Sequence, residues 1–152
     1  MTMAALDKPR NNRTLLCFDY GLKRIGVAVG QDITGTANAL TTLKASDGKP
    51  DWEAISRLIT QWQPDAVVVG LPLNMDGSSH ELTDRAQRFG NQLHGRYNLR
   101  AYFVDERLSS LEAERLLKSR SRKVQAEDID KLAAKVILET WLAQQHSQNA
   151  EQ

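Results

Sequence analysis

Acidic residues stand where predicted strands end and where a helix begins, at positions far apart in the chain. Asp19 and the pair Asp105-Glu106 each follow an apolar run, and Asp130 opens an apolar helical pattern. In open α/β sheets the carboxyl ends of neighbouring strands face a common crevice, where catalytic groups gather. We therefore expect Asp19, Asp130 and the Asp105-Glu106 pair to converge at one edge of a sheet.

Converging carboxylates are suited to binding divalent metal, because neighbours this close either take up protons or hold a cation. Oxygen ligands without His or Cys favour Mg²⁺ or Mn²⁺ over zinc. Two such ions about 3.5–4 Å apart stabilise the attacking and leaving oxygens of an in-line phosphoryl displacement. The pattern predicts that these carboxylates are catalytic and bind two Mg²⁺ or Mn²⁺ ions. Two simpler interpretations stay open: Asp105 and Arg107 form a surface ion pair, and Asp130 complements its helix dipole.

Cations next to the first acid are candidates for binding phosphate. Lys23 and Arg24 lie in the turn that follows Asp19. Gly21 and Gly26 of the same segment would let the backbone approach a phosphate or bend the hairpin. We therefore predict that Lys23 and Arg24 contact substrate.

A second basic cluster spans residues 118–123, where four of six residues are Lys or Arg. The formal net charge of the chain is only +1, so any attraction to nucleic acid must be local. We predict that Arg120, Arg122 and Lys123 bind phosphate and that this segment is mobile without substrate. A solvated charge run is the alternative interpretation.

The composition is typical of a soluble globular protein with one domain. The 152 residues are 41% hydrophobic and 26% charged, which excludes collagenous, disordered and membrane classes. The single cysteine, Cys17, excludes a disulfide framework, favours a reducing compartment and is expected in the core. No apolar stretch would cross a bilayer and no signal-peptide core is present, so we expect a cytoplasmic protein without membrane contact. The histidines His80, His94 and His146 lack metal-ligand spacing, and no nucleophile elbow or Walker A loop occurs.

Hydrophobic periodicity predicts an antiparallel meander followed by alternating helices and strands. The expected strands are Leu15–Asp19, Ile25–Gly30, Thr36–Leu43, Ala66–Val69 and Arg100–Asp105, with a turn at Ser46–Pro50. The expected helices run from an Asp51 cap to Pro64, from Ser79 to about Leu93 behind a Ser78–Glu81 capping box, from a Ser109 cap to Leu117, and over Ile129–Leu142. This order predicts an α/β, RNase H-like fold: a mixed five-stranded sheet with helices on both faces. One domain would span residues 1–152, with its core at about 14–143 and flexible tails at both ends.

Four motifs occur in an order that resembles one known family. They are Phe18-Asp19-Tyr20-Gly21 with Ile25-Gly26-Val27-Ala28, Gly70-Leu71-Pro72-Leu73-Asn74-Met75-Asp76-Gly77, Asp105-Glu106-Arg107-Leu108-Ser109-Ser110 and Ile129-Asp130-Lys131-Leu132-Ala133-Ala134. From Leu15 to Leu142 the chain resembles the YqgF/RuvX family of bacterial Holliday junction resolvase-like proteins, also described as nucleases for the precursor of small-subunit ribosomal RNA. The resemblance implies an RNase H-like fold, divalent metal and a cytoplasmic role in maturing the 5′ end of pre-16S rRNA.

The resemblance also suggests roles for single residues. The acidic positions of the family fall on Asp19, Glu106 and Asp130. The roles of Asp76, Asp105 and Asp128 stay open, because Glu127 and Asp128 crowd Asp130 and strand alternation points Asp105 away from Glu106. Asn74, in a loop that resembles the substrate-side loop of the family, and Arg107 join the predicted substrate-binding set, which is Lys23, Arg24, Asn74, Arg107, Arg120, Arg122 and Lys123.

Three functions remain open. A metal-dependent nuclease that hydrolyses phosphodiesters and processes the 5′ end of pre-16S rRNA is favoured. A Holliday junction resolvase in DNA recombination and repair is the alternative, but a resolvase needs a dimer and the sequence shows no obvious apolar dimer face. A non-catalytic nucleic-acid-binding, transcription-associated or ribosome-associated factor is the third. The expected partners are pre-rRNA or branched DNA and ribosomal particles, with the protein as a monomer or weak homodimer.

Overall fold

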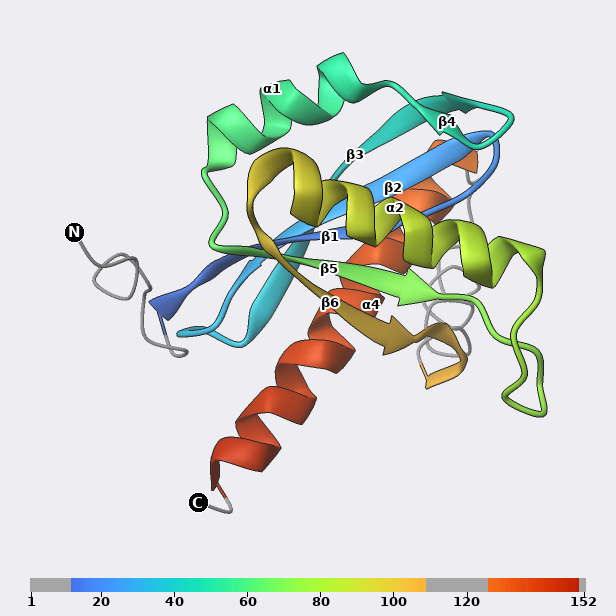
Figure 1. Cartoon of the computed structure of the whole chain (residues 1–152). Helices are drawn as coiled ribbons and strands as arrows, with labels where there is room; N and C mark the ends of the chain where they lie inside the picture. Colours follow the sequence, from blue (N-terminus) through green and yellow to red (C-terminus); the bar gives the residue numbers. More distant parts are fainter. Residues whose placement is uncertain (1–11, 109–125, 151–152) are drawn as a thin grey trace.

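The computed structural model describes residues 12–108 and 126–150, and a mixed sheet forms their centre (Figure 1). Its strands are β1 (Thr14–Asp19), β2 (Arg24–Gln31), β3 (Thr36–Ser46), β4 (Lys49–Pro50), β5 (Ala66–Leu71) and β6 (Arg100–Asp105). Within the described residues they form one six-stranded sheet in the order β4-β3-β2-β1-β5-β6. The strands β1 to β4 pair antiparallel in sequence order, whereas β1–β5 and β5–β6 are parallel. Parallel pairing brings the carboxyl ends of β1, β5 and β6 to one edge.

The predicted sheet is confirmed except for its strand count and for several strand ends, since β3 continues past Leu43 to Ser46 and β5 continues past Val69 to Leu71. Five strands were expected, and β4 is a sixth, formed by the last two residues of the predicted turn. The hairpin between β3 and β4 is tight, since Asp47 and Gly48 both have positive φ, 50° and 80°. Its pairing of Ser46 with Lys49 also carries β3 past Leu43, where the sequence pattern ended.

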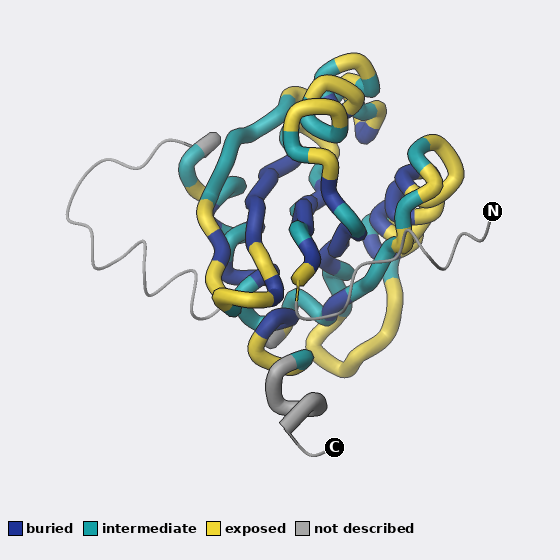
Figure 2. The backbone as a smooth tube through the Cα atoms, turned by 90° about the vertical axis from the view of Figure 1, so that its left-hand side faces the viewer, coloured by how far each residue is buried: buried dark blue, intermediate teal, exposed yellow. Residues whose placement is uncertain are grey.

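Helices cover both faces of the sheet, as predicted. They are α1 (Trp52–Trp62), α2 (Glu81–Tyr97) and α4 (Ala126–Ala150), and the 3-10 turn η3 (Glu106–Leu108) follows β6 directly. Side chains alternate across a strand, so Leu15 and Cys17 of β1 pack under α4, while Leu16 and Phe18 pack under α1 and α2. Figure 2 shows the buried strands beside α1 and α2, whose outer sides are exposed.

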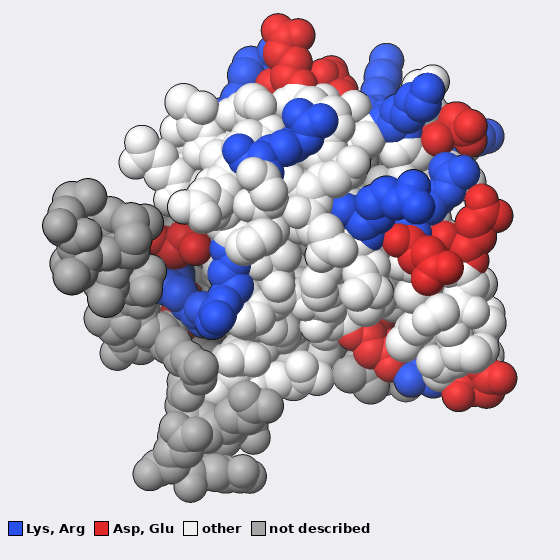
Figure 3. Space-filling view, in the orientation of Figure 1, with Lys and Arg blue, Asp and Glu red and all other residues white. Residues whose placement is uncertain are grey.

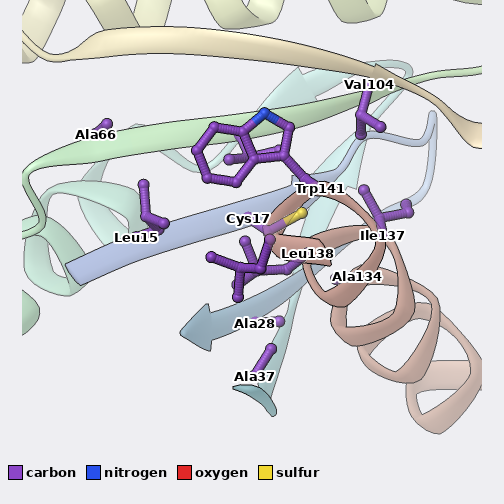
Figure 4. Packing of buried hydrophobic residues seen from close by; sticks show 12 residues of the cluster. Leu15, Cys17, Ala28, Ala37, Ala66, Val104, Ala134, Ile137, Leu138 and Trp141 are labelled. Carbon is purple, nitrogen blue, oxygen red and sulfur yellow. The ribbon is translucent and has the colours of Figure 1, made fainter. Parts of the chain in front are cut away.

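The core under α4 is closed by large side chains of that helix. Ile137, Leu138 and Trp141 point from α4 onto the sheet, above Leu15 and Cys17 (Figure 4). Cys17 is fully buried, which confirms its expected place in the core. Because α4 is anchored by this apolar face, the polar residues near its start are held in a fixed place beside the sheet.

The helix ends follow side-chain caps that the sequence predicted in part. Asp51 caps α1 by accepting a bond from Ala54 N at 3.2 Å, as predicted. The predicted Ser78–Glu81 capping box is wrong: His80 caps α2, with Nδ1 accepting from Leu82 N at 3.3 Å. Ser78 is already used in the preceding loop, where Asp76 Oδ1 accepts from its backbone N at 2.9 Å. Helix α2 therefore begins at Glu81 instead of Ser79 and continues to Tyr97.

The last helix is longer than the pattern indicated. It begins at Ala126 and continues to Ala150, beyond the apolar stripe that ends at Leu142. The expected helix from Ser109 to Leu117 and the basic residues Arg120, Arg122 and Lys123 lie outside the described residues. None of the helices in residues 12–108 and 126–150 is both long enough and apolar enough to span a bilayer.

Candidate active site

Asp19 and Glu106 meet at the carboxyl edge of the sheet. Asp19 is the last residue of β1, and Glu106 follows β6, with β5 between the two strands. Their carboxyl groups hydrogen-bond to each other. Burial raises the pKa of Asp19 well above its usual value, and the negative charges of Glu106 and Asp130 raise this pKa further. Burial likewise raises the pKa of Glu106. The pair therefore holds a proton readily, or a cation in its place.

Gly70 makes this contact possible. It is on β5, directly between the two strands, opposite Val104 of β6. A Cβ at Gly70 would lie 2.6 Å from Glu106 Oε1 and 3.0 Å from Ile137 Cδ1. The Glu106 side chain thus lies over the bare backbone of Gly70 and reaches across β5 toward Asp19. The sequence offered Gly70 only as the start of a loop, and its position before Leu71-Pro72 carried no signal of this role.

Asp130 is brought to the same edge by the docking of α4 on β2. Gly26 of β2 pairs with Asp19 of β1. A Cβ at Gly26 would lie 2.0 Å from the carbonyl oxygen of Asp130, so the helix backbone rests directly on the strand. Gly26 was expected to admit phosphate or bend the hairpin, but in the structure it admits a helix. The predicted convergence of Asp19, Glu106 and Asp130 follows from these two close approaches.

Arg24 holds the third carboxylate. Its Nε donates to Asp130 Oδ2 at 2.7 Å, and the two side chains are 39% and 24% exposed. Arg24 was predicted to bind phosphate and Asp130 to bind metal, yet in the structure each is the partner of the other. Among the described residues no group of three His, Cys, Asp or Glu side chains is arranged to hold a metal ion. The donor chemistry of Asp19 and Glu106 fits a hard divalent cation, whereas a three-carboxylate site is not formed while Asp130 faces Arg24.

Arg107, which was predicted to bind substrate, contacts Asp105 and the 72–78 loop in the structure. Its guanidinium forks onto Asp105, with Nε 3.1 Å from Oδ1 and Nη2 2.6 Å from Oδ2. Its Nη1 donates to the carbonyl of Met75 at 3.0 Å. The fork lowers the pKa of Asp105. The interpretation as a surface ion pair thus describes Asp105, and Arg107 ties the 72–78 loop to the end of β6.

The loop between β5 and α2 is closed by its own polar side chains. Asn74 Nδ2 donates to Ser78 Oγ at 3.0 Å, and its backbone N donates to Ser78 O at 2.9 Å. Asp76 Oδ1 accepts from Ser78 Oγ at 2.6 Å, and these bonds to Ser78 lower the pKa of Asp76. Asn74 and Asp76 are exposed, so they lie on the surface near the carboxyl edge but not in the carboxylate cluster.

Two further residues of interest lie at the periphery. Lys23 is exposed in the turn between β1 and β2, where its carbonyl accepts from Ala45 N at 2.8 Å. Asp128, an alternative to Asp130, lies 3.4 Å from Lys131 Nζ on the surface of α4. The structure therefore brings together Asp19, Glu106 and Asp130, with Arg24 beside them, and places Lys23 and Asp128 outside this cluster.

Comparison with known proteins places the chain in a family. A protein from Nitrosococcus oceani named "Putative pre-16S rRNA nuclease" is 54% identical over 147 residues, covering 95% of this chain and 97% of that protein. A protein of the same name from Pectobacterium atrosepticum is 52% identical over 138 residues, covering 90% and 99%.

Solved structures share the fold. RuvC of T. thermophilus, in complex with a Holliday junction substrate, has a TM-score of 0.54 at 15% identity, covering 88% of this chain and 96% of that chain. The Holliday junction resolvase of fowlpox virus has a TM-score of 0.52 at 12% identity, covering 87% and 99%. The RuvX family, described as Holliday junction resolvase, matches residues 13–144. The chain therefore belongs to the RuvX family and has the RNase H-like fold of these resolvases.

Proposed function

We propose that the protein is a nuclease that hydrolyses phosphodiester bonds and that its substrate is the 5′ end of pre-16S rRNA. The observation that carries this proposal is the contact of Asp19 and Glu106 at the carboxyl edge of the sheet. Two acids in contact are costly for the fold, because each opposes the ionisation of the other. Such an arrangement is expected where the charge is used for binding or catalysis.

The carboxylate pair is suited to hold Mg²⁺ or Mn²⁺, with Asp130 as a third ligand once Arg24 releases it. A bound divalent cation would supply charge stabilisation to the phosphoryl group and lower the pKa of a water. The chain itself orients the acids. Gly70 leaves room for the Glu106 side chain, and Gly26 allows the backbone of Asp130 to lie against β2. Arg24, once it turns from Asp130, is placed to neutralise a phosphate oxygen beside the same acids.

The relatives favour RNA over branched DNA as the substrate. Proteins more than 50% identical carry the name of a pre-16S rRNA nuclease, whereas RuvC shares the fold at 15% identity. Junction resolution is the second candidate, supported by the description of the family as Holliday junction resolvase. A role in rRNA processing would place the protein in the cytoplasm, with ribosomal precursor particles as partners.

The test compares the wild type with Asp19→Asn on two substrates. The substrates are an RNA that carries the 5′ extension of 16S rRNA and a four-way DNA junction, each with Mg²⁺, Mn²⁺ or EDTA. Asp84→Asn is the matched control, since it makes the same chemical change at an exposed position of α2. We expect Asp19→Asn to bind RNA but not cut it, with Asp84→Asn as active as the wild type. Full activity of folded Asp19→Asn would contradict the proposal, and faster cleavage of the junction than of the RNA would favour the second candidate.

A further inference from the structure

A pocket of about 560 Å³ opens on the face of the sheet that α1 and α2 cover, opposite the face of α4. Its walls come from the β3–β4 hairpin, from the start of α1 and from one side of α2, and they include Tyr20, Gly48, Lys49, Trp52, Arg85 and Arg88. Lys and Arg side chains gather over α2 and near β4 in Figure 3. Its lining contains none of the acids Asp19, Glu106 and Asp130.

The charge of the pocket is positive. Lys49, Arg85 and Arg88 line it, and Asp47 is the one acidic residue in its lining. Arg85 is partly engaged, since Nη1 donates to the carbonyl of Asp47 at 3.2 Å and Nη2 lies 3.4 Å from exposed Glu81. Lys49 and Arg88 are exposed and make no ion pair with any residue in the described part of the chain. Two cations are therefore available to an anion that enters the pocket.

The floor of the pocket is formed by fixed groups. Tyr20 donates its hydroxyl to the carbonyl of Gly48, and Gly48 N donates to Leu22 O at 2.9 Å. A side chain at Gly48 would collide with this floor, since a Cβ there would lie 2.7 Å from the hydroxyl oxygen of Tyr20. Trp52 forms a wall and is held between Phe89, at 5.7 Å between ring centroids, and Arg96, whose guanidinium lies 4.0 Å from the ring centroid. The pocket is thus formed before a ligand arrives.

The pocket and the carboxylate cluster share one point of the chain. Tyr20 directly follows Asp19, and consecutive Cα atoms are about 3.8 Å apart. Asp19 faces the site on the α4 side, while Tyr20 is buried in the cluster of side chains under α1 and α2. The pocket and the acids therefore lie at the same edge of the sheet, on opposite faces. An extended strand of nucleic acid that crosses this edge would reach both.

We propose that this pocket binds a backbone phosphate of the substrate strand, next to the phosphodiester that is cut. The proposal rests on the proposed nuclease function and adds a contact that positions the strand. Lys49 and Arg88 neutralise the phosphate. The recognition does not depend on base sequence, because contacts with backbone phosphates carry no sequence information. Arg85 holds the hairpin against α2 and keeps the pocket open.

The test measures binding of labelled single-stranded RNA in EDTA as a function of salt. Lys49→Gln, Arg88→Gln and the double variant are compared with Arg57→Gln, which removes an exposed cation from α1 outside the pocket lining. Each lost phosphate contact should reduce the salt slope by about 0.7 and the affinity by roughly threefold. We expect the double variant to bind about tenfold more weakly, for RNAs of unrelated sequence alike, and Arg57→Gln to match the wild type.

The outcomes separate this proposal from the proposed function. An unchanged salt slope in the double variant overturns the pocket proposal, while cleavage by the wild type would still support the nuclease. If the wild type cuts neither substrate but the double variant loses affinity and slope, the pocket stands as a nucleic-acid contact and the nuclease assignment fails. Inorganic phosphate is a second arm: if it competes with RNA at micromolar concentration, the pocket is a site for free phosphate and the strand contact is overturned. Melting curves of each variant confirm folding.

Discussion

Arg24 donates from Nε to Asp130 Oδ2 at 2.7 Å, although the two residues are 106 positions apart. The bond joins the first residue of β2 to the start of α4, beside the Asp19–Glu106 pair. Each partner offsets a charge that the other would otherwise present to the site. In this structure the guanidinium of Arg24 therefore binds Asp130, one of the three acids.

Replacing Arg24 by Gln should strengthen metal binding. Without the guanidinium, Asp130 is released to join Asp19 and Glu106, and a positive charge that repels the ion is gone. We expect Mn²⁺ to stabilise Arg24→Gln by about 1 kcal/mol more than the wild type, which is a roughly fivefold lower Kd. Melting temperatures with and without Mn²⁺ measure this difference, and Arg57→Gln should behave like the wild type. An equal or smaller Mn²⁺ shift in Arg24→Gln would show that Asp130 is not a ligand.

Replacing Asp19 by Asn should stabilise the metal-free protein, increasingly so as the pH rises. The pKa of Asp19 is raised in the folded state, so the folded protein binds this proton more tightly than the unfolded chain does. Its contribution is fully present below the unfolded pKa, near 3.9, and is lost as the pH rises toward the folded pKa. Asn does not titrate and avoids this loss. Urea unfolding in EDTA from pH 4 to pH 8 should show a growing advantage of Asp19→Asn, whereas a difference that stays constant with pH would contradict a raised pKa at Asp19.

Replacing Gly26 by Ala should unfold the protein or strongly lower its free energy of unfolding. The added Cβ would lie 2.0 Å from a backbone oxygen of α4, and no side-chain rotation relieves that contact. We expect a loss of about 3 kcal/mol or more in the free energy of unfolding. Gly95→Ala is the matched control, because nothing lies within 4 Å of a Cβ there and the residue is inside α2. The control should gain about 0.5–1 kcal/mol from helix propensity, so equal stabilities of the two variants would refute the close approach.

Replacing Gly70 by Ala should reduce cleavage more than stability. The new methyl group would compete with the Glu106 carboxyl and with the flexible end of Ile137, both of which are side-chain atoms that move. Displacing Glu106 by about 1 Å is expected to cost on the order of 100-fold in cleavage rate. The measurement is kcat together with the melting temperature. A variant with the wild-type kcat would mean that the position of Glu106 is unimportant.

Replacing Arg107 by Lys should loosen the 72–78 loop. Lysine keeps the charge but loses the fork that bonds Asp105 and the Met75 carbonyl together. Amide hydrogen exchange at Gly77 and Ser78 should speed up several-fold while exchange in β1 and β5 stays the same. Unchanged exchange in the loop would show that its own Asn74 and Asp76 bonds suffice.

The sequence predicted the strands and helices well because their signals are local. Periodicity located β1, β5 and β6, and the ends of parallel strands gave the expectation that Asp19 and Glu106 approach each other. The two-residue strand β4 was missed because a period cannot be recognised over two residues. His80 was not recognised as the cap of α2, since choosing it over Ser78 requires knowing that Asp76 already binds Ser78.

The residues that Arg24 and Glu106 contact could not be predicted from the sequence, because they depend on how α4 and β5 pack. Which anion Arg24 faces depends on where α4 docks, and that depends on a missing side chain at Gly26. The space for Glu106 depends in the same way on Gly70. A sequence shows that these residues are glycines but not which neighbour fills the space above them. The basic pocket was missed for a related reason, because Lys49 comes from β4 whereas Arg85 and Arg88 come from α2, more than 30 residues later in the chain.

The antiparallel and parallel pairings of β1 divide the loops of the molecule between two rims. Thr14 pairs with Gln31, and Ala66 pairs with Arg100, so the turn after β2 and the connections into β5 and β6 lie at the rim opposite Asp19. Thr34, in the turn after β2, is exposed at this opposite rim. A fluorophore or a surface tether attached there would leave the acids, the pocket and the loop of Met75 open to solution. The rim that contains Thr34 therefore offers a point of attachment away from the face on which substrate binding is proposed.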